Sequence, residues 1–171
     1  MFSVIYSGGI HGMEAYLVRV EVDLSRGLPG FELVGSVSGE VKEAKERVQI
    51  ALKNAGVSLP VARITVNLSP ANVRKEGTGY DLPIAAGLIV CMENIEVSCL
   101  AKSAFLGELT LNGEIKRVNG VLPAALALKK QGIERMIIPL ENVGECRKVP
   151  GMEIVGLRHV TELLAYLQAT E

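Results

Sequence analysis

The chain has 171 residues, of which 49% are hydrophobic and only 4% aromatic, so we expect one domain with a core of Val, Ile, Leu and Ala. Its formal net charge is −1, from 18 basic and 19 acidic residues, whereas dedicated nucleic-acid-binding domains are usually basic overall. The net charge therefore gives no support to DNA binding, which would need a local basic patch.

The sequence predicts a cytoplasmic location without membrane partners. The apolar run over residues 82–92 is too short to cross a bilayer, and no secretory signal pattern occurs at the N-terminus. Cys91, Cys99 and Cys146 show no Cys-x-x-Cys spacing. We interpret them as free, buried thiols in a reducing compartment.

Hydrophobic periodicity predicts that strands dominate the first part of the chain. Glycines after residue 6 are expected to end the first strand. A turn at Gly-Leu-Pro is expected to reverse the chain after the second strand, so that the third strand runs back. The long second strand alternates apolar and polar residues, which predicts one solvent-facing side. These strands are expected over residues 2–6, 16–24 and 31–35.

A single helix is predicted next, from an N-cap at Ser38 to about Asn54, with Gly56 ending it. Its apolar residues recur every three or four positions, which predicts a buried stripe. The charged residues between them have both signs, and we interpret them as a salt-bridged exposed face rather than a nucleic-acid surface. They are Lys42, Glu43, Lys45, Glu46, Arg47 and Lys53.

The stretch from Arg63 to Gly87 predicts a strand, a basic loop with two glycines, and an abrupt apolar helix. Polar and apolar residues alternate as far as Leu68, as in a half-buried strand. Asp81 is expected to cap the helix, and Pro83 lies in its first turn, where a missing N–H costs nothing.

The last third predicts a hairpin followed by strand–helix alternation. The dipeptide Asn112-Gly113 favours a two-residue type I′ turn between strands at 105–110 and 114–118. The expected fold is a mixed α/β layer fold, with hairpin-paired strands first and packed helices around the sheet. The remaining elements are expected as a helix over 121–131, strands over 134–139 and 154–157, and a helix over 161–167.

Several separate motifs occur in a characteristic order: Gly27-Leu28-Pro29, residues 41–48, residues 63–70, Lys75-Glu76-Gly77 and residues 81–85. Together they resemble the N-terminal domain of the magnesium-chelatase-like AAA+ ATPases of the YifB/ComM family, from about Ser7 to the C-terminus. The resemblance implies a bacterial protein that forms a homo-oligomeric ring, a hexamer, and acts on DNA in recombination and natural transformation.

The second half also resembles the pattern of the Lon proteolytic domain, and this implies a fold like that of ribosomal protein S5 domain 2. Lon-type proteases use a serine nucleophile and a lysine base. At the matching positions this chain has Ile84 and Ala124, which carry no reactive atom, so the covalent step has no nucleophile. A degenerate Lon-like peptidase remains the enzymatic alternative. The matching segments are residues 106–108, 111–113, 118–120, 132–133 and 137–142.

No ATP, metal or other cofactor is expected to bind to residues 1–171 themselves. A P-loop needs Gly-x-x-x-x-Gly-Lys-(Ser/Thr), and no such string occurs. The resemblance implies an AAA+ motor domain beyond residue 171, where ATP and Mg²⁺ are expected to bind. The two histidines, His11 and His159, lack neighbouring ligands for a metal site.

Five basic residues are the candidates for a nucleic-acid contact, in which Lys and Arg would neutralise phosphates without sequence choice. If the fold resembles that of Lon, the loop near Gly77 and the hairpin after Gly113 lie near each other. The alternatives are ordinary solvated charge, balanced by Glu76 and Glu114, and a pure protein-interaction module. The candidates are Arg63, Arg74, Lys75, Lys116 and Arg117.

Overall fold

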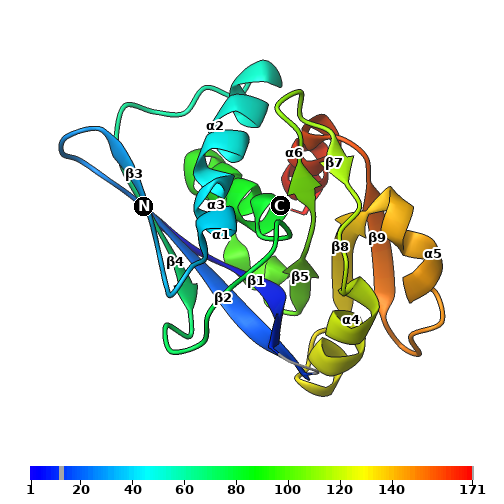
Figure 1. The fold of residues 1–171 in the computed structure, drawn as a ribbon. Helices are drawn as coiled ribbons and strands as arrows, with labels where there is room; N and C mark the ends of the chain where they lie inside the picture. The colour runs from blue at the N-terminus through cyan, green and yellow to red at the C-terminus, as the bar shows by residue number, and fades with distance from the viewer. Residues whose placement is uncertain (12–13, 171) are drawn as a thin grey trace.

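The computed structural model describes residues 1–11 and 14–170. Seven strands form one mixed sheet in the order β3-β4-β2-β1-β5-β8-β9 (Figure 1). A separate two-stranded ribbon consists of β6 and β7. The strands are β1 (Phe2–His11), β2 (Glu14–Ser25), β3 (Gly30–Val34), β4 (Arg63–Ser69), β5 (Ser103–Phe105), β6 (Glu108–Leu109), β7 (Ile115–Lys116), β8 (Arg135–Pro139) and β9 (Glu153–Leu157).

Helices cover both faces of the sheet. On one face α2, α3 and α6 share a core with the inward side chains of β1, β2 and β4. On the other face α4 lies against β1 and β2 and α5 lies against β9, and both share a second core with side chains of β5 and β8. The helices are α1 (Gly39–Lys42), α2 (Ala44–Asn54), α3 (Asp81–Glu93), α4 (Val121–Lys130), α5 (Val143–Cys146) and α6 (Val160–Ala169), with 3₁₀ turns η1 (Val97–Leu100) and η2 (Leu140–Asn142). The predicted mixed α/β fold with packed helices is confirmed.

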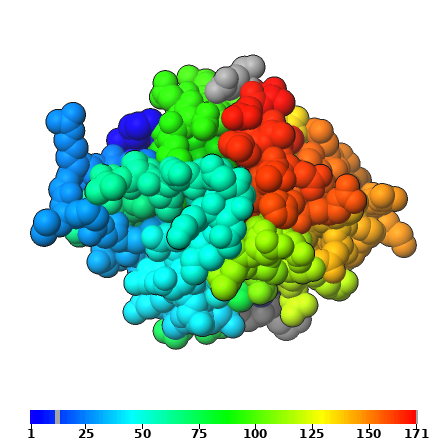
Figure 2. Space-filling view, turned by 90° about the horizontal axis from the view of Figure 1, so that it is seen from above, coloured from blue at the N-terminus to red at the C-terminus, as the bar shows by residue number. Residues whose placement is uncertain are grey.

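The sheet has an antiparallel and a parallel part. Strand β2 pairs antiparallel with β1 and β4, whereas β1, β5, β8 and β9 pair parallel in turn. Parallel neighbours need crossover connections, and α4 and α5 lie in those after β5 and β8. Figure 2 shows the face on which α2, α6 and the segment around β6 and β7 meet, with the β2–β3 turn projecting to one side.

Helix α3 is the centre of the larger core, because residues 82–91 are all buried. Its run of uncharged side chains is compatible with burial on every side. Gly87 allows the helix to approach the sheet closely, since a Cβ there would lie 2.6 Å from Cγ2 of Val22. Among the described residues, no helix has the length and apolar character needed to cross a bilayer.

Two strand predictions were wrong. Strand β1 does not end at the glycines, because Gly8 and Gly9 continue the pairing with Leu17 and Tyr16 of β2. Strand β3 does not return against β2 as a hairpin. Instead β4 lies between them, antiparallel to β2 and parallel to β3. Local turn signals cannot show that a later strand inserts between two earlier ones.

The hairpin near Asn112 is confirmed, but its predicted two-residue turn is not. Thr110 and Glu114 close the loop, with N of Thr110 3.0 Å from O of Glu114, so three residues separate them. Gly113 has φ +87°, as the last position of such a three-residue loop requires.

The predicted helix from Ser38 is interrupted at Glu43 and forms α1 and α2, although Ser38 does cap the first.

The cysteine prediction holds for two of the three residues. Cys91 and Cys146 are buried free thiols, whereas Cys99 is exposed in η1. Burial raises the pKa of the Cys146 thiol to about 11, which keeps it protonated near neutral pH.

Candidate functional site

A cavity of about 550 Å³ opens between the end of β1, the loop before α3 and the turn that leads into α4. Its walls are largely main chain, because five of the lining residues are glycines. The lining residues are Gly8, Gly9, Ile10, Glu40, Glu76, Gly77, Thr78, Gly79, Tyr80, Leu106, Val118, Asn119, Gly120 and Ala124.

The two positions that match the Lon-type serine and lysine are both hydrocarbon and both buried. Ala124 lines the cavity and is 1% exposed, whereas Ile84 is 0% exposed and belongs to the core around α3. Within residues 1–11 and 14–170, no hydrogen bond joins a serine hydroxyl to a lysine amine. The cavity therefore presents no activated serine in this conformation.

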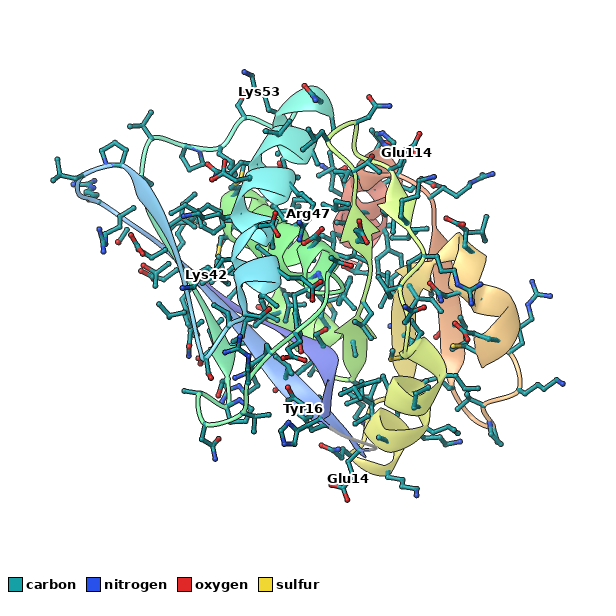
Figure 3. All side chains as sticks on the ribbon, viewed as in Figure 1. Glu14, Tyr16, Lys42, Arg47, Lys53 and Glu114 are labelled. Carbon is teal, nitrogen blue, oxygen red and sulfur yellow. The ribbon has the colours of Figure 1, made fainter. Side chains whose placement is uncertain are left out.

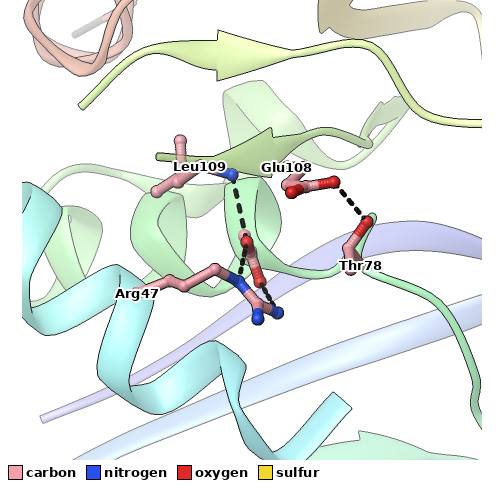
Figure 4. Close-up of polar contacts among 5 residues, drawn as sticks. Arg47, Thr78, Glu108 and Leu109 are labelled. Atoms are coloured by element: carbon pink, nitrogen blue, oxygen red, sulfur yellow. Dashed lines mark hydrogen bonds and ion pairs between the residues drawn. The ribbon is translucent and has the colours of Figure 1, made fainter. Parts of the chain in front are cut away.

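An ion pair between the partly buried Arg47 and the fully buried Asp81 fixes the start of α3 (Figure 4). Arg47 of α2 donates to both oxygens of Asp81, with Nε 2.7 Å from Oδ2 and Nη2 3.0 Å from Oδ1. The backbone N–H of Leu109 donates to the same Oδ2 at 3.0 Å. The prediction that Asp81 caps its own helix was wrong, because its carboxylate instead joins α2, α3 and β6.

Burial controls the protonation of this pair. Asp81 is 0% exposed, and loss of solvent raises the pKa of its carboxyl group to about 6, although the bonds from Arg47 and Leu109 oppose the increase. The hydrogen bond to Asp81 raises the pKa of the Arg47 guanidinium, which stays protonated.

Further contacts attach the loop before α3 to the β6–β7 hairpin. The hydroxyl of Thr78 donates to Oε2 of Glu108 at 2.7 Å (Figure 4), and the N–H of Gly107 donates to O of Gly79 at 3.0 Å. In the ribbon, Glu108 pairs with Lys116. The expected proximity of this loop to the hairpin is thus confirmed.

Lys75 was wrongly placed on the surface. Its side chain is 0% exposed, and its ammonium donates to the carbonyl oxygens of Gly35, at 2.7 Å, and Pro70. A backbone bridge to Val37 draws this residue beneath the loop. Burial lowers the pKa of the Lys75 ammonium. This lysine cannot reach a nucleic acid without rearrangement of the loop.

The other four candidate basic residues are exposed but do not form one patch. Arg74 pairs with Glu76 at 3.4 Å, and Lys116 pairs with Glu114 at 3.0 Å, so the expected balancing acids are present. Arg63 lies at the first position of β4, the opposite end of that strand from the loop. Arg117 follows β7 and is exposed.

The prediction that the charged residues from Lys42 to Lys53 form a salt-bridged exposed face was wrong. Figure 3 shows Lys53 directed away from the molecule and Arg47 directed toward α3. In the part of the chain that the structure describes, Arg47 is the one charged residue of this helix with an ion pair. Helical spacing could have predicted this orientation, because residue 47 lies on the same face of the helix as the buried residues 44, 48 and 51.

Sequence reasoning also missed Asn142, which fixes the segment before α4. Its Oδ1 accepts from N of Val118 at 3.1 Å, and its Nδ2 donates to O of Val118 at 2.9 Å and to Glu145. No local pattern reveals this pairing, because the residues are distant in sequence.

His159 caps α6, and the described residues contain no group of three or more potential metal ligands.

Comparisons with known proteins identify the family. Residues 20–142 match the family described as subunit ChlI of Mg-chelatase. The chain is 40% identical over 169 residues to competence protein ComM of Haemophilus influenzae, which covers 99% of the chain and 33% of that protein. It is 35% identical over 166 residues to YifB of Escherichia coli, which covers 97% of the chain and 33% of that protein.

A more distant similarity extends to the Lon proteases. Lon protease 2 of Bacillus subtilis is 29% identical over 180 residues, covering 92% of the chain and 32% of that protein. The chain spans about a third of the length of these curated relatives. It belongs to the family of the ChlI subunit of Mg-chelatase, with ComM and YifB among its relatives.

Proposed function

We propose that this chain is a non-proteolytic accessory domain of a larger magnesium-chelatase-like AAA+ ATPase. The observation that carries this proposal is the hydrocarbon at both Lon-type catalytic positions, Ile84 and Ala124, in a domain similar to Lon. Without a nucleophile and a base, acyl transfer has no first step. The remaining roles for such a domain are binding and assembly.

The whole protein is proposed to contain an AAA+ motor C-terminal to residue 171, which binds ATP and Mg²⁺ and assembles as a hexameric ring in the cytoplasm. Membership in the ChlI family and the threefold greater length of ComM and YifB support this proposal. In it the present domain contributes surface to ring assembly in ATP-dependent DNA processing, which includes recombination and natural transformation.

DNA contact is proposed through the exposed basic residues beside the cavity, which are Arg74, Lys116 and Arg117. The contacts between the loop before α3 and the β6–β7 hairpin support it, because they bring Arg74 and Lys116 to neighbouring segments. The contact is electrostatic and is made to the phosphate backbone.

The test is duplex DNA binding by the full-length protein across a range of salt concentrations. We expect Lys116→Glu/Arg117→Glu to weaken binding and to reduce the slope of log K against log salt by about one for each phosphate that is no longer neutralised. Arg63→Glu, at the opposite end of β4, is the matched control and is expected to change neither value. An unchanged slope in the double variant would remove DNA from the proposal.

Two alternatives have distinct readouts. A degenerate Lon-like peptidase would be labelled at a defined serine by a serine-reactive phosphonate, and labelling at one site would overturn the non-proteolytic assignment. If the domain is a pure protein-interaction module, Lys116→Glu/Arg117→Glu and Arg63→Glu are both expected to bind DNA as tightly as the wild type. The ring is still expected to assemble.

A further inference from the structure

Among the described residues, no strand pairs with the outer edge of β1 beyond Tyr6. Met1 and Leu24 exchange both backbone hydrogen bonds, at 2.8 and 2.7 Å. This pair determines which later residue pairs of the β1–β2 ladder are hydrogen-bonded. Because bonded and non-bonded pairs alternate along an antiparallel ladder, Gly9 turns its peptide groups toward β2. Gly8 and Ile10 turn theirs toward the opposite edge.

Strand β5 does not reach this part of the edge. It pairs with β1 only where Ala104 lies opposite Tyr6. The following residues turn away from β1 toward β8, because N of Leu106 donates to O of Ile137. The carbonyl oxygen of Phe105 accepts from Oγ of Ser7 at 2.7 Å. Within residues 1–11 and 14–170, no strand pairs with the outward groups of Gly8 and Ile10, and both residues line the cavity.

Gly9 and Gly79 of the cavity wall have no room for a side chain, because other side chains of the protein pack directly against them. A Cβ at Gly9 would lie 2.5 Å from Cζ of Tyr16, and a Cβ at Gly79 would lie 2.6 Å from Cδ2 of Leu106. Because these residues lack a Cβ, they contribute main chain and no side chain to the cavity wall. An unpaired strand edge in a groove is the surface to which an extended peptide adds.

The charge of the groove selects among possible occupants. Glu40 and Glu76 are its two charged lining residues, and none of the lining residues is Lys, Arg or His. Glu40 accepts from N of Gly77 at 2.5 Å, and the pair between Glu76 and Arg74 is exposed and therefore weak. The lining itself therefore attracts a cationic side chain, whereas Arg74, Lys116 and Arg117, the cations proposed for DNA contact, are not among its residues.

We propose that this groove binds an extended, basic polypeptide segment, which adds as a strand to β1 at Gly8 and Ile10 and places Lys or Arg side chains against Glu40 and Glu76. The bound segment is held and not cleaved, because Ile84 and Ala124 supply no reactive atoms. This binding activity goes beyond the proposed contacts with DNA and the motor and does not depend on either.

The first experiment uses fluorescence anisotropy with the full-length protein and a labelled peptide, Thr-Lys-Val-Lys-Thr-Lys-Val. We expect saturable binding, and N-methylation of alternate peptide amides, which leaves the charge unchanged, is expected to weaken it at least about tenfold. Absence of binding overturns the proposal. Equal affinity for the methylated peptide overturns strand addition and leaves only charge attraction.

Two variants test the protein side. Glu76→Lys is expected to weaken binding about tenfold, whereas the matched control Glu32→Lys, on the exposed side of β3, is expected to leave the affinity unchanged. Ile10→Pro removes an outward N–H without removing a bond to β2, so it is expected to weaken binding while circular dichroism stays native. Equal affinity of Glu76→Lys and Glu32→Lys contradicts the proposed orientation.

Hydrogen exchange gives a readout that needs no variant. The amides of Gly8 and Ile10 are expected to exchange faster than that of Gly9 in the free protein and to slow when the peptide binds. Unchanged exchange at Gly8 and Ile10 overturns the assigned site. Mass spectrometry of the recovered peptide is expected to show it intact, and a discrete cleavage product would overturn non-catalytic binding.

Discussion

The guanidinium of Arg47 and the carboxylate of Asp81 form two parallel hydrogen bonds, at 2.7 and 3.0 Å, across 34 residues of sequence. Asp81 is fully buried, and Leu109 donates a third bond to it. One charged pair therefore connects α2, the start of α3 and the β6–β7 ribbon, which are the elements behind the loop wall of the cavity.

Asp81→Ala is expected to destabilise the protein by roughly 3 kcal/mol, because it leaves the Arg47 guanidinium and the N–H of Leu109 without their acceptor. Urea unfolding, with the midpoint and slope both fitted, measures the change. Glu32→Gln, at an exposed position on β3, is the control and is expected to shift the free energy of unfolding by less than about 0.5 kcal/mol. Equal effects of the two substitutions would show that the pair adds no stability.

The same ion pair predicts that the free energy of unfolding depends on pH. The pKa of Asp81 is about 6 in the folded state and 3.8 for the unperturbed group, so the folded state binds the proton more tightly. The contribution of this carboxyl group to stability is therefore fully present below pH 3.8 and is lost as pH rises through about 6.

Wild type is expected to lose stability relative to Asp81→Asn between about pH 4 and 7, by at most about 3 kcal/mol. Denaturant unfolding of both proteins at each pH isolates this difference, since their other titrating groups are shared. A relative gain by the wild type over this range would show that Arg47 lowers the pKa of Asp81 more than burial raises it.

Lys75 is expected to resist amine-reactive labelling. Its ammonium is enclosed by the carbonyls of Gly35 and Pro70, so acetylation of the folded protein should modify it far more slowly than Lys53 or Lys102, which are exposed. Peptide mapping by mass spectrometry after a timed reaction measures the three rates. Comparable rates at Lys75 and Lys53 would mean that the loop opens readily.

Lys75→Met tests the energetic role of the same residue. It keeps most of the apolar volume but removes the ammonium that donates to the carbonyl oxygens of Gly35 and Pro70, at an expected cost of about 1–3 kcal/mol. Thermal unfolding compared with Lys53→Met, an exposed control, gives the difference. A neutral result at Lys75 would indicate that desolvation of the ammonium cancels its hydrogen bonds.

Asn142→Ala is expected to cost about 2–4 kcal/mol, because both backbone groups of Val118 then lose their side-chain partner inside the fold. The segment before α4, which lines the cavity, is expected to exchange its amides faster. Asn119→Ala, at an exposed position in the same segment, should change neither stability nor exchange appreciably. Equal exchange in both variants would contradict the anchoring role.

Local sequence patterns specified most of the helices and strands. Alternating residues predicted β2 and β4, helical spacing with Ser38 and Gly56 predicted the region of α1 and α2, and the uncharged run after Asp81 predicted the buried α3. These features depend on neighbours within a few residues, which is the range over which periodicity and capping act.

Pairings between distant segments required the tertiary structure. The insertion of β4 between β2 and β3, the burial of Lys75 beneath Gly35 and the reach of Arg47 to Asp81 all join residues more than 30 positions apart. The sequence alone also determined the absence of reactive atoms at Ile84 and Ala124. Only the tertiary structure decided that Ala124 faces the cavity beside a free strand edge while Ile84 does not, because which groups line a cavity depends on how distant elements pack.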